Sequence, residues 1–226
     1  MDSLQVFRLF IALSIPDAVK STIQKAQSEL RRAVAEKSVR WARAEQFHLT
    51  LKFLGNVPAS QVKELVELLR PICAQVPPLR LTAARIGFFP NARSPRVVWG
   101  GISDPKNQLA ALWNSVQSAT RAFSTENPES AFTGHVTLAR VNRLRSQQAT
   151  SLAKSAASFE NTVFGEWTSD QIELMRSELL PEGARHSLVA VFPLLGRQPQ
   201  IQDSPGSAGV SPARRRHSQE DASTHE

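Results

Sequence analysis

A four-residue pattern occurs twice in this chain and constrains its fold more than any other feature. Residues 48–51 read HLTL and residues 135–138 read HVTL. In an extended strand, the His and Thr of each copy would lie on one face and the aliphatic residues on the other. With five His and eleven Thr in 226 residues, chance gives roughly 0.24 such H-x-T spacings. Two copies, each ending in Leu, therefore predict two similar strands that offer two imidazoles and two hydroxyls to one cleft.

The elements around the two copies also repeat in order. Apolar runs and apolar spacings of three and four predict a strand, a helix, a motif strand and a helix, and then the same order again. Several strand pairs lack an intervening helix, which favours antiparallel pairing. We therefore expect an α+β protein with two lobes related by an approximate twofold axis. Two antiparallel or mixed sheets would face a central cleft, with the helices on the outside.

The expected elements have the following bounds. A turn is predicted at Gly55–Asn56, and helices are predicted to begin at Pro16, Pro58 and Asp104 and to cover residues 146–158. Strands are predicted at 6–13, 39–43, 48–54, 79–88, 96–102, 135–138, 162–167, 171–177 and 187–192.

The formal charge of +7 belongs to the folded part of the chain. From residue 197 onward, four basic and four acidic residues balance, so the excess lies in residues 1–196. The segment from Gln198 is rich in Ser, Pro, Gly and Gln, and it lacks an apolar period. We expect a single two-lobed domain over 1–196 and a disordered tail over 197–226. A basic domain favours a polyanionic partner such as RNA.

The single cysteine, Cys73, lies in an apolar run and is expected to be a small buried residue. One cysteine forms no disulfide within the chain, which favours a reducing, cytoplasmic location. The apolar run 6–13 contains Arg8 and stops before Pro16, which does not fit a secretory signal. No apolar stretch is long enough to span a bilayer, so no membrane association is expected.

Two imidazoles on opposite sides of one phosphorus atom are suited to phosphodiester cleavage. One can remove a proton from the attacking oxygen while the other gives a proton to the leaving oxygen. The two Thr hydroxyls can donate hydrogen bonds to the non-bridging oxygens. The sequence contains no H-x-x-x-H, H-E-x-x-H or C-x-x-C spacing, so we expect neither a metal nor a cofactor.

A structural interpretation of the paired motifs stands beside this one. A single His on a strand is more often structural than catalytic, and Thr is common in strands. Duplication favours the functional interpretation, because a polar face buried at the centre of two lobes is costly unless a ligand or water satisfies it.

Four segments resemble those of a known family: 8–13 (RLFIAL), 41–43 (WAR), 47–55 (FHLTLKFLG) and 132–140 (FTGHVTLAR). They are similar to the two-histidine phosphoesterases, specifically the bacterial RNA 2′,3′-cyclic phosphodiesterases, also called LigT-like 2′-5′ RNA ligases. The resemblance covers about residues 4–195. It implies opening of a 2′,3′-cyclic phosphate at an RNA end to leave a 2′-phosphomonoester, with reversible 2′-5′ ligation in some members.

By this resemblance, His48 would be the proton donor to the leaving 3′ oxygen and His135 the base that activates water. Thr50 and Thr137 would bind the phosphate. The aliphatic motif residues Leu49, Leu51, Val136 and Leu138 would lie on the opposite strand faces. Family members usually have Pro before the second His, whereas this chain has Gly134. From this departure we expect Gly134→Pro to leave the protein active or faster.

Further residues are candidates for contact with RNA or for the core. Parity places Arg140 on the opposite strand face from His135 and Thr137 unless the strand bulges. A surface turn is expected for His186. The candidate RNA contacts are Arg43, Arg93, Arg96 and Arg140 for phosphates and Phe47, Phe89 and Phe132 for base stacking, and the expected core tryptophans are Trp41, Trp99 and Trp113.

Two other functions fit the same motifs. The first is a non-catalytic protein that binds RNA or nucleotide phosphates. The second is the same chemistry on another cyclic phosphate, such as an ADP-ribose derivative. In the favoured interpretation the partners are RNA with 2′,3′-cyclic phosphate ends or cyclic nucleotides. Since one chain supplies both lobes, a monomer is expected.

Overall fold

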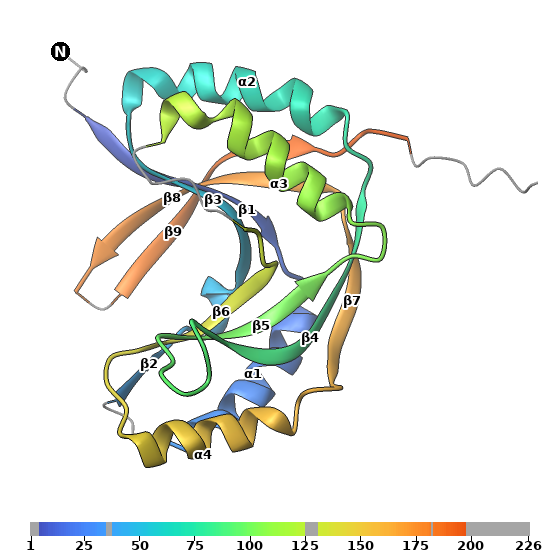
Figure 1. The fold of residues 1–226 in the computed structure, drawn as a ribbon. Helices are drawn as coiled ribbons and strands as arrows, with labels where there is room; N and C mark the ends of the chain where they lie inside the picture. Colours follow the sequence, from blue (N-terminus) through green and yellow to red (C-terminus); the bar gives the residue numbers. More distant parts are fainter. Residues whose placement is uncertain (1–4, 35–37, 125–130, 182, 198–226) are drawn as a thin grey trace, which may run out of the picture.

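The computed structural model of the chain describes residues 5–34, 38–124, 131–181 and 183–197 (Figure 1). The predicted tail lies outside the described residues, apart from Arg197. The helices are α1 (Asp17–Arg31), α2 (Val62–Ala74), α3 (Gln108–Ala119) and α4 (Ser146–Ala157). The strands are β1 (Val6–Ser14), β2 (Val39–Trp41), β3 (His48–Pro58), β4 (Leu79–Phe89), β5 (Val97–Ser103), β6 (His135–Val141), β7 (Val163–Ser169), β8 (Gln171–Leu180) and β9 (Gly183–Pro193).

The helices begin where the sequence supplies a start signal and are held by one apolar face. Pro16 precedes α1, which buries Val19, Ile23, Ala26 and Leu30. Before α3, the carboxylate of Asp104 accepts hydrogen bonds from the backbone of Gln108 at 2.6 Å and of Leu109 at 3.4 Å. This carboxylate satisfies amides that have no partner within the helix.

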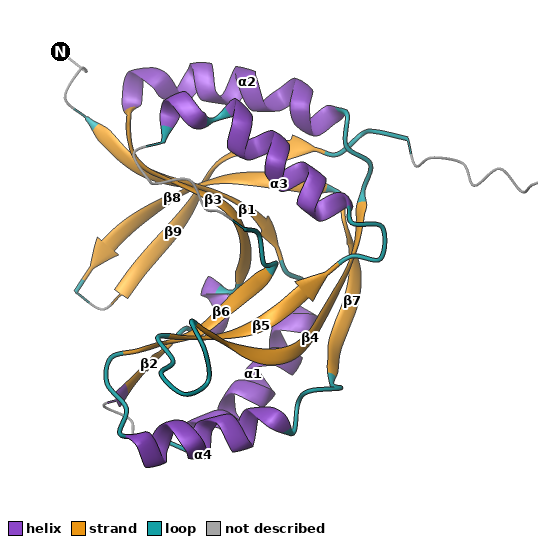
Figure 2. Cartoon of the chain, viewed as in Figure 1, coloured by secondary structure: helices purple, strands orange, loops and turns teal. Residues whose placement is uncertain are grey.

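The strands form one curled antiparallel sheet with the order β7-β4-β5-β6-β3-β1-β8-β9, and β2 pairs with the outer part of β6. The helices lie outside this sheet (Figure 2). The α+β class with helices outside a cleft is therefore confirmed. The two expected sheets are continuous, because β3 and β6 meet at the single register pair Leu49 and Val136.

Each half of the sheet is covered partly by a helix from the other half. In the first half, β1, β3, β8 and β9 are covered by α2 and α3; in the second, β4–β7 are covered by α1 and α4. Helix α1 follows β1 but packs on β7, and α3 follows β5 but packs on β3. The predicted repeat is thus β1-α1-β3-α2 and β5-α3-β6-α4. The crossing helices interleave the lobes.

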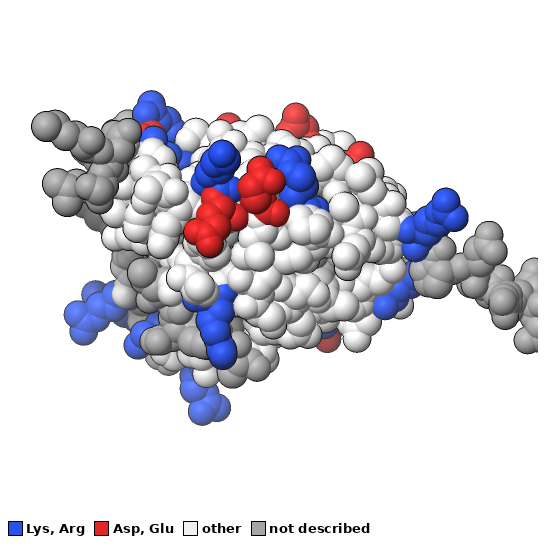
Figure 3. All heavy atoms as spheres, turned by 90° about the horizontal axis from the view of Figure 1, so that it is seen from above, with Lys and Arg blue, Asp and Glu red and all other residues white. Residues whose placement is uncertain are grey.

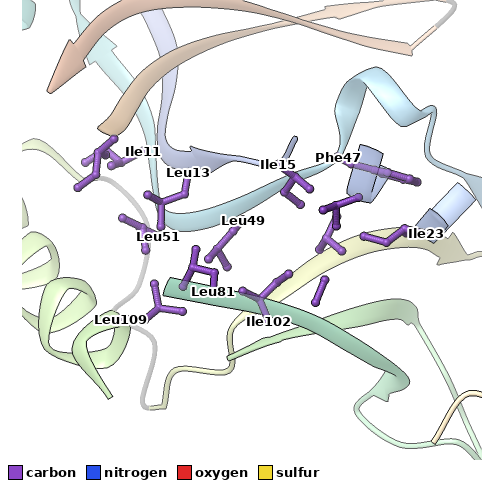
Figure 4. Close-up of a cluster of buried hydrophobic side chains, with 14 of the residues drawn as sticks. Ile11, Leu13, Ile15, Ile23, Phe47, Leu49, Leu51, Leu81, Ile102 and Leu109 are labelled. Carbon is purple, nitrogen blue, oxygen red and sulfur yellow. The ribbon is translucent and has the colours of Figure 1, made fainter. Parts of the chain in front are cut away.

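The aliphatic motif residues are buried on the strand face opposite the His and Thr side chains. Leu49, Val136 and Leu138 are 0% exposed and Leu51 is 2% exposed. Figure 4 shows Leu49 and Leu51 among Ile11, Leu13, Leu81, Ile102 and Leu109. The alternation predicted from the sequence is confirmed at these four positions.

Both motif strands carry an extra residue directly after the motif Thr. Leu51 has no partner between Thr50 and Lys52 in the register with β1, and Leu138 has none between Thr137 and Ala139 in the register with β5. As a result two consecutive residues are buried at each site, Leu51 with Lys52 and Leu138 with Ala139. These β-bulges reverse the side-chain alternation beyond them.

A glutamine from each crossing helix donates a hydrogen bond to the carbonyl of the bulged residue. Gln27 on α1 donates to Leu138 O at 2.9 Å and to Ala42 O at 2.8 Å. Gln117 on α3 donates to Leu51 O at 3.3 Å. The approximate twofold symmetry therefore extends to these side chains.

Several sequence predictions are corrected by the fold. Gly55–Asn56 is not a turn, since β3 continues to Pro58 and Gly55, with φ +74°, lies beside a second register shift in β3. Strands β8 and β9 form a longer hairpin than expected. Cys73 is buried as predicted, and burial raises the pKa of its thiol to about 12. None of the described helices is long and apolar enough to cross a membrane.

We expect Gln27→Leu to lower the free energy of unfolding by about 1–3 kcal/mol, because it removes both hydrogen bonds from a side chain that is 3% exposed. Chemical denaturation measures this change. Gln24→Leu on the exposed side of the same helix is the matched control. Equal stability of the two variants would show that these bonds do not stabilise the fold.

Candidate active site

The two motif strands place their polar side chains around one cavity of about 390 Å³. Its walls include His48, Thr50, His135 and Thr137, together with Phe53 and Arg140. Its volume lies within the range of small-molecule sites. The two imidazoles are near enough that charge on His135 lowers the pKa of His48. The predicted convergence of both motifs on one cavity is therefore seen in the structure.

Each catalytic candidate is oriented by a backbone carbonyl two residues earlier. The Nδ1 of His135 lies 2.8 Å from the carbonyl oxygen of Thr133. A carbonyl oxygen only accepts, so Nδ1 carries the proton and the Nε2 of the neutral ring is free to accept one. His48 forms a hydrogen bond with the backbone of Gln46, also two residues earlier.

His48 lies against two rings on its side of the cavity. Phe10 stacks on it with centroids 4.8 Å apart, and His186 meets it edge-on at 5.4 Å with an interplanar angle of 88°. Burial, and then the charge of His186, lower the pKa of His48 to about 4. His48 is therefore neutral at neutral pH.

His135 also has an aromatic wall. Phe89 on β4 meets it edge-on at 5.1 Å, and Trp99 on β5 lies 6.4 Å away. Trp99 is half-buried and lies outside the described hydrophobic core, so its prediction as a core residue is wrong. The approximate twofold symmetry thus gives each imidazole an aromatic neighbour on the strand beside its own, Phe10 on β1 and Trp99 on β5.

Most of the chain is similar in sequence to known phosphoesterases. The family described as LigT-like phosphoesterase matches residues 13–99. A curated RNA 2′,3′-cyclic phosphodiesterase of Archaeoglobus fulgidus is 30% identical over 185 residues, covering 82% of this chain and 99% of the relative. The chain belongs to the LigT-like phosphoesterases.

Solved structures of this LigT-like fold are also similar. TT0787 of Thermus thermophilus matches with a TM-score of 0.68 and 26% identity, covering 84% of this chain and all of that one. E. coli LigT complexed with 3′-AMP matches with a TM-score of 0.68 over 84% of this chain and 99% of that one. At 24% identity, the second likeness concerns the fold alone.

The bulges bring two further residues into the LigT-like cavity. Phe53 and Arg140 each lie three positions after a motif Thr, and in a regular strand both would face away from it. Because Leu51 and Leu138 are bulged, both side chains line the cavity. The sequence placed Arg140 on the opposite face from His135 unless the strand bulged, and the strand does bulge. The role of Arg140 in binding remains a prediction.

His186 was expected in a surface turn, and this expectation is wrong. It lies in β9, opposite Ser177 of β8, and its ring packs against His48 and Phe10. Its buried Nδ1 has no hydrogen-bond partner among the described residues. Burial lowers the pKa of His186. In the sequence, His186 follows shortly after Gly183, and a glycine is typical of a turn. Its position in a strand depends on pairing with β8, which no local pattern reveals.

Most of the other candidate RNA contacts lie away from the cavity. Phe47 is 2% exposed in the core, so it has no free face for a base, and its prediction is wrong (Figure 4). Phe132 stacks on Trp113 at 5.3 Å, which occupies the ring that was expected to stack on RNA. Arg43, Arg93 and Arg96 are exposed but do not line the cavity. Phe89 does line it.

The side chains that could ligate a metal ion do not cluster in the described part of the chain. Within those ranges, no three His, Cys, Asp or Glu side chains gather where they could hold such an ion.

The expectation for Gly134 is reversed by its surroundings. A Cβ atom at this position would overlap the carbonyl oxygen of Ile102. The same two residues are joined by a hydrogen bond from Ile102 N to Gly134 O at 2.8 Å. Glycine therefore permits β5 to approach the residue that precedes His135.

We now expect Gly134→Pro and Gly134→Ala to lower the melting temperature and the activity, because the added carbon must displace backbone next to His135. Thermal unfolding and turnover of a cyclic nucleotide measure both effects. Gly100→Ala is the control, since its Cβ would meet only Val136 Cγ1 at 3.2 Å. Full stability and activity of Gly134→Pro would contradict this prediction and support the expectation from the sequence that proline is tolerated before His135.

We expect His186→Gln to raise the pKa of His48 from about 4, because it removes the second-largest cause of the lowering, the charge of His186. An NMR titration of the His48 ring measures this pKa. Lys20→Gln is the control, because Lys20 is the smallest of the causes. An unchanged pKa in His186→Gln would show that the charge of His186 has no influence on His48.

The same shift fixes the sign of the pH dependence of stability. A folded pKa of about 4 lies below the ordinary 6.5, so the unfolded chain binds more protons at His48 between these two pH values. The contribution of His48 is therefore fully present above pH 6.5 and is lost as the pH falls toward 4. Because His186→Gln should raise the pKa of His48, it should narrow the pH range over which this stability is lost.

Proposed function

We propose that this protein opens 2′,3′-cyclic phosphates at RNA ends, leaving 2′-phosphomonoesters, by acid–base catalysis between His48 and His135 without a metal. The observation that carries the proposal is that both imidazoles and both Thr hydroxyls line one cavity. The names of the relatives support the substrate: the Archaeoglobus fulgidus protein is an RNA 2′,3′-cyclic phosphodiesterase.

In the proposed reaction the free Nε2 of His135 accepts a proton from water as the water oxygen attacks phosphorus. The bond between phosphorus and the 3′ oxygen breaks, and His48 gives its proton to that oxygen. The product carries a 2′-phosphate and a 3′-hydroxyl. Thr50 and Thr137 donate hydrogen bonds to the non-bridging oxygens, where negative charge increases. The resemblance, rather than the nearly symmetric geometry, assigns the acid to His48.

Because the pKa of His48 is low, His48 can act as an acid only if the bound substrate raises this pKa. His48 is neutral at neutral pH, because burial and the charge of His186 disfavour the cation. A bound phosphodiester brings a negative charge next to the ring and raises the pKa of His48. The acid therefore becomes charged when its substrate is present. A 5′-hydroxyl in place of water would give 2′-5′ ligation at the same site.

A cytoplasmic location and a monomeric state also remain predictions. A single buried cysteine supports the first. The contribution of both motif strands by one chain supports the second.

We expect the protein to convert 2′,3′-cyclic AMP to 2′-AMP in the presence of EDTA, and His48→Ala and His135→Ala each to lower kcat about 10²–10⁴-fold. Chromatography separates 2′-AMP from 3′-AMP. Thr50→Val and Thr137→Val should also lower kcat, whereas Thr168→Val, at an exposed position outside the cavity, is their control.

Three results would contradict the proposal. Binding of the nucleotide without product would indicate a phosphate-binding protein. Turnover that EDTA abolishes would require a metal. Faster turnover of a cyclic phosphate of ADP-ribose than of any RNA end would show that the substrate is an ADP-ribose derivative and not RNA.

A further inference from the structure

A second cavity of about 600 Å³ adjoins the catalytic cavity. The two share Phe53, Thr137 and Arg140, so they form one continuous surface. We call this second cavity the hairpin groove, since it lies between the β8–β9 hairpin and strands β1, β2 and β6. His186 belongs to its wall and touches His48. The groove therefore begins at the catalytic histidines.

The hairpin groove carries three arginines from three strands: Arg8 on β1, Arg40 on β2 and Arg140 on β6. None of the described residues that line it is an Asp or Glu. By contrast, the arginines of β8 and β9 are paired: Glu178 lies 3.0 Å from Arg176 and 2.7 Å from Arg185. The positive charge of the groove arginines is thus not offset by a carboxylate among the described residues that line the groove.

Arg40 and Arg140 are directly opposite each other in the β2–β6 register. Like charges at opposed positions of an antiparallel pair destabilise a sheet. A bound anion between the two guanidinium groups would offset this repulsion, and a phosphodiester is suited to the fork of NH donors that arginine presents.

The groove also has apolar surface. Trp41 on β2 and Leu179 and Leu180 on β8 line it, and Leu179 is 69% exposed. These side chains can pack against a ribose or a base, as expected of a surface that binds single-stranded nucleic acid.

Two other surfaces show how the groove differs from the rest of the molecule. A cavity of about 680 Å³ elsewhere contains Arg80, but it also contains Asp104 and Glu166. The face seen from above in Figure 3 has acidic and basic side chains side by side, and exposed α2 residues include Lys63, Glu64, Glu67 and Arg70. On both surfaces carboxylates offset the positive charge.

We propose that the hairpin groove binds the phosphodiester and the nucleoside on the 5′ side of the cyclic end, so that the preferred substrate is an oligoribonucleotide and not a mononucleotide. This inference rests on the proposed function. A 2′,3′-cyclic mononucleotide has a 5′-hydroxyl and leaves the groove unfilled. An RNA end has a phosphodiester at that 5′ oxygen, and this is the anion that Arg40 and Arg140 would bind, with Arg8 as a third groove arginine.

The experiment compares three substrates: 2′,3′-cyclic AMP with a 5′-hydroxyl, its 5′-phosphorylated form, and the dinucleotide ApA with a 2′,3′-cyclic end. We expect kcat/KM to be roughly tenfold or more higher for the two substrates with the added phosphate, since one charge-assisted contact contributes about that much. Arg8→Gln and Arg40→Gln should each move the ratio of dinucleotide to mononucleotide kcat/KM toward one.

Arg80→Gln is the matched control, because it removes the same charge from the other cavity and should keep the ratio. Raising the salt concentration should lower kcat/KM more steeply for the dinucleotide, with an added logarithmic slope of about 0.7 per phosphate contact. The extra slope should disappear in Arg40→Gln.

The outcomes separate this inference from the proposed function. If no cyclic substrate is opened, the proposed function fails. If 2′,3′-cyclic AMP is opened as efficiently as the dinucleotide, or if Arg80→Gln changes the ratio as much as Arg40→Gln, the inference about the hairpin groove is overturned while the proposed function stands.

Discussion

The hydrogen bonds from Gln27 and Gln117 to the bulged residues connect the packing of this molecule to its chemistry. Gln27 and Gln117 come from the helices that cross between the lobes, and each donates to the carbonyl of a bulged leucine. Each bulge turns the residue three positions after the motif Thr toward the cavity. Each crossing helix therefore also fixes the side-chain direction in the motif strand of the half-sheet that it covers.

The electrostatics of the cavity follow from how deeply its two imidazoles lie. His48 lies against Phe10 and His186, and the cost of charge there keeps the ring neutral at neutral pH. The arginines lie further out, along the hairpin groove, where water can reach them. In the proposed function, positive charge would attract the substrate at the groove, while proton transfer would take place in surroundings that disfavour an unpaired charge.

Alternation within the chain was sufficient to predict much of this arrangement. It placed His48, Thr50, His135 and Thr137 on one face and four aliphatic residues in the core, and both are observed. The same rule places Phe47 on the core side with Leu49, so its burial could have been predicted. The position of Arg140 and the contact of His186 could not, because they depend on a bulge and on the partner strands of a hairpin, which are non-local.

The single register pair between β3 and β6 has a mechanical consequence. Leu49 and Val136 join these two strands, and His48 and His135 are their immediate neighbours in the chain. The two imidazoles therefore lie directly beside the pair that joins the two halves of the sheet. A rotation of one half-sheet against the other about this pair would displace the outer ends of the strands more than it would displace His48 from His135.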